Sequence, residues 1–172
     1  MKFSDIPQLT RDGEWECTYD LKRAVRQIEE WEKKEGLQLN PDFQRGHVWT
    51  EDQQIKFVEY ILRGGRTAKV IYFNNPGWQS GDFDKNNFVC VDGLQRITAL
   101  RKFINNEIKA FGYYFKEFEG NVRVMQGIRF NINTLRTRKE VLRWYIEFNS
   151  GGTVHTEKEI ERVRKLLEQE DK

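Results

Sequence analysis

The stretch that decides the fold is Val89-Cys90-Val91-Asp92-Gly93-Leu94-Gln95-Arg96-Ile97-Thr98-Ala99-Leu100. It begins with a short, continuous apolar run, which is typical of a strand covered on both faces. Gly93 then allows a sharp turn and a close approach of the backbone to a ligand. From Leu94 onward the apolar residues recur at helical spacing. The stretch therefore predicts a buried strand, a one-glycine turn and the start of a helix.

The start of that helix is a candidate anion site. The first N–H groups of a helix have no partner inside it, so they are available to a negatively charged group. Asp92 stands at the mouth of the helix and Arg96 lies one turn further on. A carboxylate that can hold a metal ion, free amides and an arginine are the groups that a nucleotide phosphate requires. A simpler interpretation also stays open, in which Asp92 caps the turn and Arg96 points into water.

A second candidate phosphate contact lies upstream, in a loop over residues 40–49. The loop carries Gln44 and Arg45 between two aromatic residues, Phe43 and Trp49. Arg45 is the candidate phosphate contact in this loop. The alternative is that the two rings fill the core while Arg45 faces solvent.

Composition bounds the function without naming it. The chain has 172 residues, enough for one domain with a core, and 33% of them are charged with a net charge of +2. A balanced total leaves nucleic-acid binding open, because a local basic patch can be hidden in it. No apolar run approaches about 20 residues, so no membrane span is expected.

The positions of the cysteines and histidines bear on disulfide bonds and on zinc binding. Cys17 and Cys90 both fall in strand-like runs, which predicts two free thiols, a reducing compartment and a cytoplasmic location. His47 and His155 have no Cys or His at ligand spacing, so no zinc site is expected. The N-terminus lacks the apolar region of a signal peptide.

The remaining pattern mixes strands and helices. We expect strands at residues 15–19, 37–39 and 68–73, a helix from Asp20 to about Glu35, and helices that begin at the capping boxes Thr50–Gln53 and Thr137–Glu140. Two later runs, 108–118 and 122–132, alternate like strands and are predicted to pair around a turn at 119–121.

These elements predict an α+β fold, with a small mixed sheet flanked by helices, a late antiparallel ribbon and C-terminal helices. We expect one domain over residues 1–172, with an N-terminal arm at 1–14 and a terminal helix at 156–172.

Two segments carry a resemblance to a known family. Pro41-Asp42-Phe43-Gln44-Arg45-Gly46-His47-Val48-Trp49 has the pattern P-x-x-Q-R-x-x-x-W, and Asp92-Gly93-Leu94-Gln95-Arg96 has the pattern D-G-x-Q-R. In this order they resemble the N-terminal domain of the GmrSD-type restriction proteins, which belong to the ParB/sulfiredoxin-like superfamily. The resemblance covers roughly residues 15–160 and includes Phe148–Gly152, which is similar to that family's Asn-x-Gly-Gly segment. The family's motif is usually D-G-Q-Q-R, with a further Gln at the position that Leu94 occupies here. This replacement weakens a side-chain role at that position but leaves the backbone role unchanged.

The resemblance implies a ParB-like nucleotide pocket in which the two motifs face each other. It assigns catalytic roles to Asp92, Arg96, Gln95 and Gln44, with Asp92 holding Mg²⁺. The nucleotide would be bound by Arg45, Gly93, Leu94, Arg96 and Asn149. The implied activity is Mg²⁺-dependent hydrolysis of a nucleoside triphosphate (NTP) linked to DNA restriction, with DNA and a nuclease chain as further partners.

Two other functions stay open. The chain could act directly on nucleic acid as a nuclease or phosphotransferase, along basic positions Arg123, Arg129, Arg136, Arg138, Lys139 and Arg143. It could also be a non-catalytic sensor of a nucleotide or modified base that acts through a partner chain. A Walker-type NTPase is excluded, because no G-x-x-x-x-G-K-[ST] motif occurs.

Overall fold

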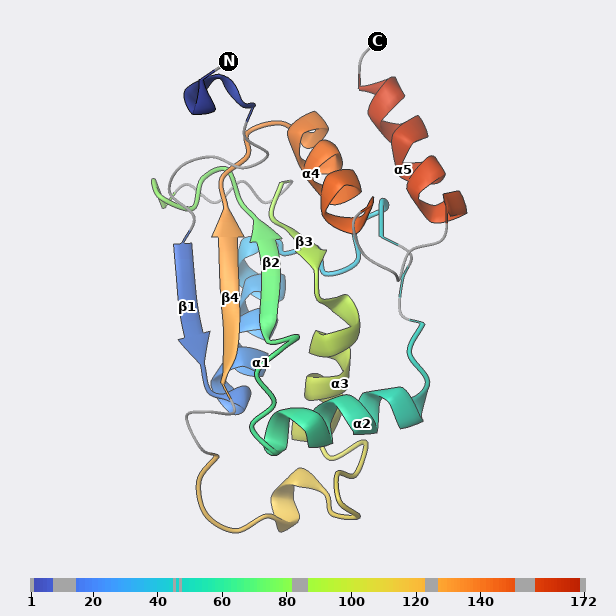
Figure 1. The fold of residues 1–172 in the computed structure, drawn as a ribbon. Coiled ribbons are helices and arrows are strands. Elements are labelled where there is room, and N and C mark those ends of the chain that lie inside the picture. The colour runs from blue at the N-terminus through green and yellow to red at the C-terminus, as the bar shows by residue number, and fades with distance from the viewer. Residues whose placement is uncertain are drawn as a thin grey trace.

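Four short strands form one mixed sheet that helices cover on both faces (Figure 1). A computed structural model of the protein describes residues 2–7, 15–44, 46, 48–81, 87–122, 127–150 and 157–170. Its elements are η1 (Phe3–Asp5), β1 (Trp15–Tyr19), α1 (Leu21–Glu30), the π-helical turn η2 (Trp31–Glu35), α2 (Glu51–Leu62), β2 (Val70–Asn74), β3 (Val89–Asp92), α3 (Leu94–Ile104), the 3₁₀ turn η3 (Phe115–Glu117), β4 (Ile128–Asn133), α4 (Arg138–Ser150) and α5 (Glu157–Gln169). This arrangement confirms the predicted α+β class.

β4 lies inside the sheet, whose strand order is β1-β4-β2-β3. It pairs antiparallel with β1, which sets Cys17 beside Phe130. It pairs parallel with β2, which sets Ile71 on the other side of Phe130. β2 and β3 are antiparallel. β4, the last of these four strands along the chain, therefore lies between β1 and β2 and pairs with both.

The predicted ribbon between residues 108–118 and 122–132 is wrong. Within the described part of these runs only β4 is a strand, and its sheet partners are β1 and β2. Residues 123–126 lie outside the described residues.

Residues 108–118 fold back on themselves instead. Phe111 and Gly112 both have positive φ (52° and 82°), and the main-chain groups of Ala110 and Tyr113 exchange hydrogen bonds of 2.9 and 3.0 Å across them. This is a two-residue turn within the run that was predicted to be one strand. The rings that follow pack on α3, where Phe103 is the partner of Phe115 at 5.4 Å between centroids. Phe118 also contacts Phe103, whereas Phe111 and Tyr113 are exposed, so the alternation of aromatic residues here does not mark a strand.

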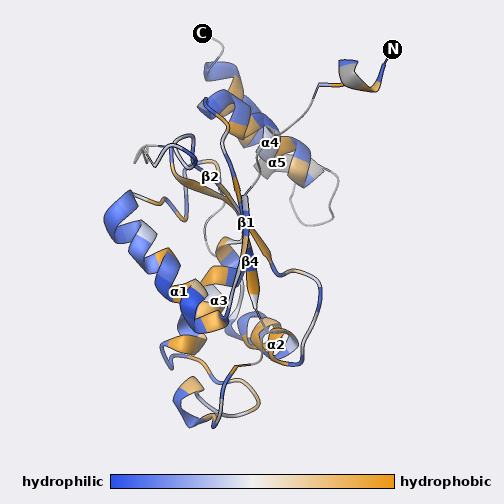
Figure 2. Ribbon diagram, turned by 90° about the vertical axis from the view of Figure 1, so that its left-hand side faces the viewer, coloured by the Kyte–Doolittle hydropathy of each residue, from blue (hydrophilic) through white to orange (hydrophobic). Residues whose placement is uncertain are grey.

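Side chains of the strands enter two hydrophobic cores, one on each face of the sheet. On one face, Ile71, Cys90 and Phe130 are fully buried against α1, α2 and α3. On the other face, Val89 and Val91 pack with α4 and α5. Figure 2 views the sheet close to edge-on and shows its apolar residues between these helices.

Trp31 anchors the first core. It is 2% exposed, and its ring lies 5.2–5.4 Å from the rings of Phe73, Phe88 and Phe130. Aromatic pairs at this distance add to the free energy of burial. One side chain from η2 thus joins β2, β4 and the residue before β3.

Local signals set most helix ends where they were predicted. Asp20 accepts a hydrogen bond of 3.0 Å from the main-chain N–H of Arg23. The predicted capping box forms between Thr50 and Gln53. Gly36 ends η2 in the left-handed conformation at φ 73°. The predicted strand at 37–39 is reduced to one bridge, between Gln38 and Val89.

No helix among the described residues combines the length and the apolar character that crossing a bilayer requires.

The turn between β3 and α3 predicts the effect of adding one methyl group. Gly93 has φ 125°, and a Cβ built on it would lie 2.7 Å from Cδ1 and 2.8 Å from Cγ2 of Ile71. We expect Gly93→Ala to lower the free energy of unfolding by about 1–3 kcal/mol, since it adds backbone strain and overpacking. Urea denaturation measures this loss. Gly112→Ala is the matched control, because Gly112 has φ 82° and open space around it. An equal loss in both variants would contradict the contact with Ile71.

The two thiols should react differently, although both are free. Burial raises the pKa of the Cys90 thiol, and the nearby Asp92 carboxylate raises it further. The thiolate is the reactive form, so Cys90 should stay unlabelled by iodoacetamide at neutral pH while the half-buried Cys17 is labelled. Mass spectrometry of the digested protein measures both positions, with a urea-unfolded sample as the control. Equal labelling of the two cysteines in the folded protein would contradict this.

Candidate functional site

The predicted strand, glycine turn and helix form as β3, Gly93 and α3. Gly93 is the N-cap of α3, and no side chain there accepts a hydrogen bond from the first turn. Leu94 is 8% exposed and belongs to the core. Gly93 and Leu94 can therefore contribute to an anion site at this helix start only through their main-chain groups.

Arg96 holds the turn to the neighbouring strand. Its Nη2 forms an ion pair with the Asp92 carboxylate, and its Nη1 donates to the main-chain oxygens of Val70 (2.7 Å) and Ala68 (3.3 Å). The side chain of Arg96 is 14% exposed and that of Asp92 is 30% exposed. The guanidinium thus faces both the start of β2 and the carboxylate at the mouth of α3. It does not point freely into water.

Gln95 fastens the upstream loop to α3. Its Oε1 accepts hydrogen bonds from the main-chain N–H groups of Val48 (2.9 Å) and Trp49 (3.1 Å), and its Nε2 donates to the oxygen of Gly46 (2.7 Å). One side-chain amide therefore satisfies three main-chain groups of the loop. The two sequence motifs meet at this residue.

Gln44 makes a second link between the motifs. Its Nε2 donates to the main-chain oxygen of Cys90 in β3, two residues before Asp92. The structure thus brings together Gln44, Asp92, Gly93, Leu94, Gln95 and Arg96. Arg45 lies outside the described residues.

Asn149 lies near the C-terminal end of α4. Its Nδ2 donates to the main-chain oxygen of Tyr145 one turn earlier, at 2.8 Å, and the residue is 9% exposed. The preceding Phe148 contacts Tyr72, whose backbone is paired with that of Asp92. This end of α4 is thus linked to the turn through Tyr72, while the Asn149 amide donates within its own helix.

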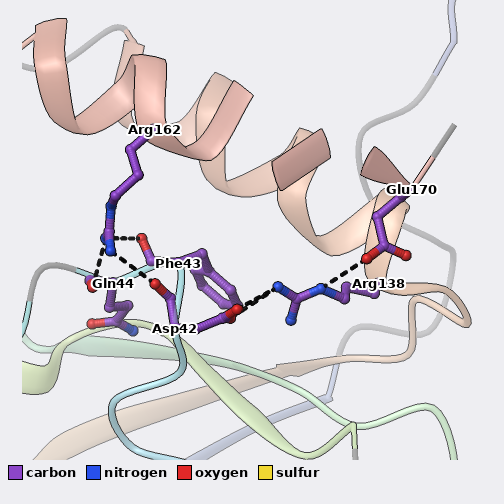
Figure 3. Close-up of polar contacts among 6 residues, drawn as sticks. All are labelled: Asp42, Phe43, Gln44, Arg138, Arg162 and Glu170. Atoms are coloured by element: carbon purple, nitrogen blue, oxygen red, sulfur yellow. Dashed lines mark hydrogen bonds and ion pairs between the residues drawn. The ribbon is translucent and has the colours of Figure 1, made fainter. Parts of the chain in front are cut away.

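The loop is also held from the side of α4 and α5, by contacts that the sequence did not predict (Figure 3). Arg138 of α4 donates to both carboxylate oxygens of Asp42, at 2.9 and 2.8 Å. Arg162 of α5 donates to the main-chain oxygens of Asp42, Phe43 and Gln44. No local signal could reveal them, because Arg162 is 118–120 residues from its partners.

The donor set bears on which metal site is feasible. Among the described residues, no three His, Cys, Asp or Glu side chains gather as a metal cage. Mg²⁺ is commonly held by one or two carboxylates together with substrate phosphates. The partly exposed Asp92 fits that kind of site.

The comparisons with known proteins agree with the two motifs. The family model described as the GmrSD restriction endonuclease N-terminal domain matches residues 28–150, which include both of them. The searches of curated proteins and of solved structures gave no match. The matched segment is more than half of the chain, and so the protein belongs to the family of GmrSD restriction endonuclease N-terminal domains.

Proposed function

We propose that this domain binds an NTP with Mg²⁺ at the Asp92–Arg96 turn and hydrolyses it in support of DNA restriction. Membership of the GmrSD N-terminal domain family gives the chain a role related to restriction endonucleases. The nucleotide and its hydrolysis are the further step argued from the turn.

One observation carries the proposal: a carboxylate and a guanidinium are paired at a helix start that has no side-chain cap. The amide groups of that first turn favour an anion, and the helix dipole adds to the attraction. Asp92 is the more exposed partner, with 30% of its side chain accessible. The Asp92 carboxylate would repel a bare phosphate, so the phosphate is expected to bind together with Mg²⁺, within reach of the amides and Arg96.

The ion pair also suggests how a metal–nucleotide complex would bind. When the nucleotide is bound, Asp92 would hold Mg²⁺ and Arg96 would hold the phosphates. Both charges keep a partner of opposite sign, so neither is left uncompensated in a partly buried site. Arg96 could keep its hydrogen bond to Val70, which would hold the guanidinium in place.

Hydrolysis of a phosphate needs positioning and charge stabilisation more than covalent chemistry. When bound, Mg²⁺ would supply neutralisation of charge on the phosphates. Arg96 would stabilise the charge that develops on the transferred group. Gln44 and Gln95 already use their amides on main-chain groups, so we assign them the task of holding the loop against the turn.

A nuclease function of the chain itself has less support. Two of the basic residues that could line a nucleic-acid track are paired with carboxylates: Arg129 with Glu16 at 3.6 Å, and Arg138 with Asp42 at 2.8 Å. Such pairs reduce the positive charge available to phosphates. We therefore place cleavage of DNA in a partner nuclease domain or chain.

The first prediction concerns the nucleotide itself. A ligand that binds only the folded state raises the melting temperature. At about 100 times its dissociation constant, the preferred NTP should raise it by about 5–10 °C. A thermal-shift panel of ATP, GTP, CTP and UTP, each with Mg²⁺, measures this, and Mg²⁺ alone is the control. No shift with any of the four would contradict nucleotide binding.

The second prediction concerns Asp92. Asp92→Asn keeps an oxygen that can accept from Arg96 but removes the charge that would hold Mg²⁺. We expect NTP affinity in the presence of Mg²⁺ to fall about tenfold or more, and the melting temperature of the free protein to fall as well, because Arg96 loses its counter-charge. Isothermal titration calorimetry measures the affinity. Asp52→Asn is the matched control, because Asp52 is paired with Lys56 on the exposed face of α2. Equal affinities in the two variants would rule out the role of Asp92.

A further inference from the structure

We infer that Arg162 of α5 is a positioning residue for the loop that carries Gln44 and Arg45, an inference that rests on the proposed nucleotide site. Its guanidinium donates to three consecutive main-chain oxygens, of Asp42 (3.0 Å), Phe43 (3.0 Å) and Gln44 (2.7 Å) (Figure 3). The oxygens of consecutive residues converge on one cation only when the backbone curls around it. Arg162 therefore fixes the course of the loop at the residues that precede Arg45.

The loop has an apolar anchor beneath these hydrogen bonds. Phe43 is 2% exposed, and its ring lies 5.1 Å from that of Tyr145 on α4. The ring holds one side chain of the loop in the core, but it does not set the direction of the neighbouring carbonyl groups. That direction is what the planar fork of Arg162 determines, because its donors have fixed relative positions.

A second arginine holds the same loop from another angle. Arg138 donates from Nη2 to both carboxylate oxygens of Asp42 and from Nε to Glu170 near the end of α5, at 3.1 Å. The side chains of Arg138, Asp42 and Glu170 are 36–61% exposed, so solvent screens both ion pairs. Arg162 bonds to neutral main-chain oxygens, whose positions bear directly on the path of the backbone.

The effect of Arg162 reaches the candidate site through Gln44. The oxygen of Gln44 that Arg162 holds belongs to the peptide bond that joins Gln44 to Arg45. The side chain of the same residue donates to Cys90 in β3, two residues before Asp92. Gln44 is thus hydrogen-bonded to α5 through its main-chain oxygen and to β3 through its side-chain amide.

α5 lies outside the segment that the family model matches, which ends at residue 150. It packs against α4 through the buried Ile160 and Val163, which flank Arg162. The helix thus supports the loop over residues 40–49 from outside the matched segment, and Arg162 is its contact to that loop.

The test compares Arg162→Ala with Arg162→Lys and with Arg164→Ala. Arg164 is the matched control, because it lies on the same helix, its side chain is 57% exposed, and it forms an ion pair of 3.7 Å with Glu161 of α5 itself. Hydrogen exchange by mass spectrometry follows the peptide over residues 40–46, and calorimetry with Mg²⁺ and each of ATP, GTP, CTP and UTP follows affinity. The melting temperature reports on the structure as a whole.

We expect Arg162→Ala to speed exchange in this peptide and to weaken binding of the preferred NTP about tenfold, with a small change in melting temperature. Arg162→Lys should restore part of both effects, because an ammonium can reach a subset of the oxygens. Arg164→Ala should change neither. If α5 itself also exchanges faster in Arg162→Ala, the comparison uses the lysine variant, which keeps the charge and the aliphatic stem. Slower exchange at residues 40–46 in Arg162→Lys than in Arg162→Ala then supports the inference, and equal exchange overturns it.

Unchanged exchange at residues 40–46 in Arg162→Ala would overturn the inference. Faster exchange with unchanged affinity would also overturn it, since the loop would then be ordered to no effect on binding. If the wild-type protein binds none of the four nucleotides, the proposed function fails on its own. The exchange comparison then still decides whether Arg162 positions the loop.

Discussion

The absence of a side chain at Gly93 lets α3 start against the sheet. Ile71 fills the space that a Cβ would need, so the turn after β3 lies as close to β2 as the backbone permits. This closeness brings Arg96 within reach of the main-chain oxygens of Ala68 and Val70 while it remains paired with Asp92. The close packing of Gly93 on Ile71 thus sets the positions of the charged side chains of Asp92 and Arg96.

Around this turn, order in the loop over residues 40–49 comes from side chains that bond to main-chain groups. Gln95 satisfies its later part, Gln44 ties it to β3, and Arg162 gathers the oxygens at its earlier part. A segment without regular secondary structure needs such partners, because buried main-chain polar groups that lack them destabilise the fold. In its described residues, the loop is thus tied to β3, α3 and α5 by side chains and has no strand ladder.

The sequence predicted the parts of the structure whose causes are local. The caps at Asp20 and Thr50 and the strand, glycine and helix around Gly93 depend on residues a few positions apart, so their patterns were sufficient. The predicted ribbon is wrong because Phe111 and Gly112 turn the chain within the first run, and the aromatic alternation gave no sign of that turn.

The contacts of the site itself were beyond the reach of local patterns. Arg96 bonds to residues 26 and 28 positions away, and Arg162 to residues at least 118 positions away. The motifs indicated which residues belong together, but not that Gln44 and Gln95 spend their amides on the backbone.

The interior place of β4 has a consequence for how the protein is made. β4 is the last of the four strands along the chain, yet it is the neighbour of both β1 and β2. On the ribosome, β1 emerges more than a hundred residues before its partner at 128–133, and its hydrogen-bonding edge stays open throughout that interval. Open edges pair readily with other chains, and pairings between distant segments form slowly. The nascent chain therefore keeps an unpaired strand, which favours aggregation, until β4 is released.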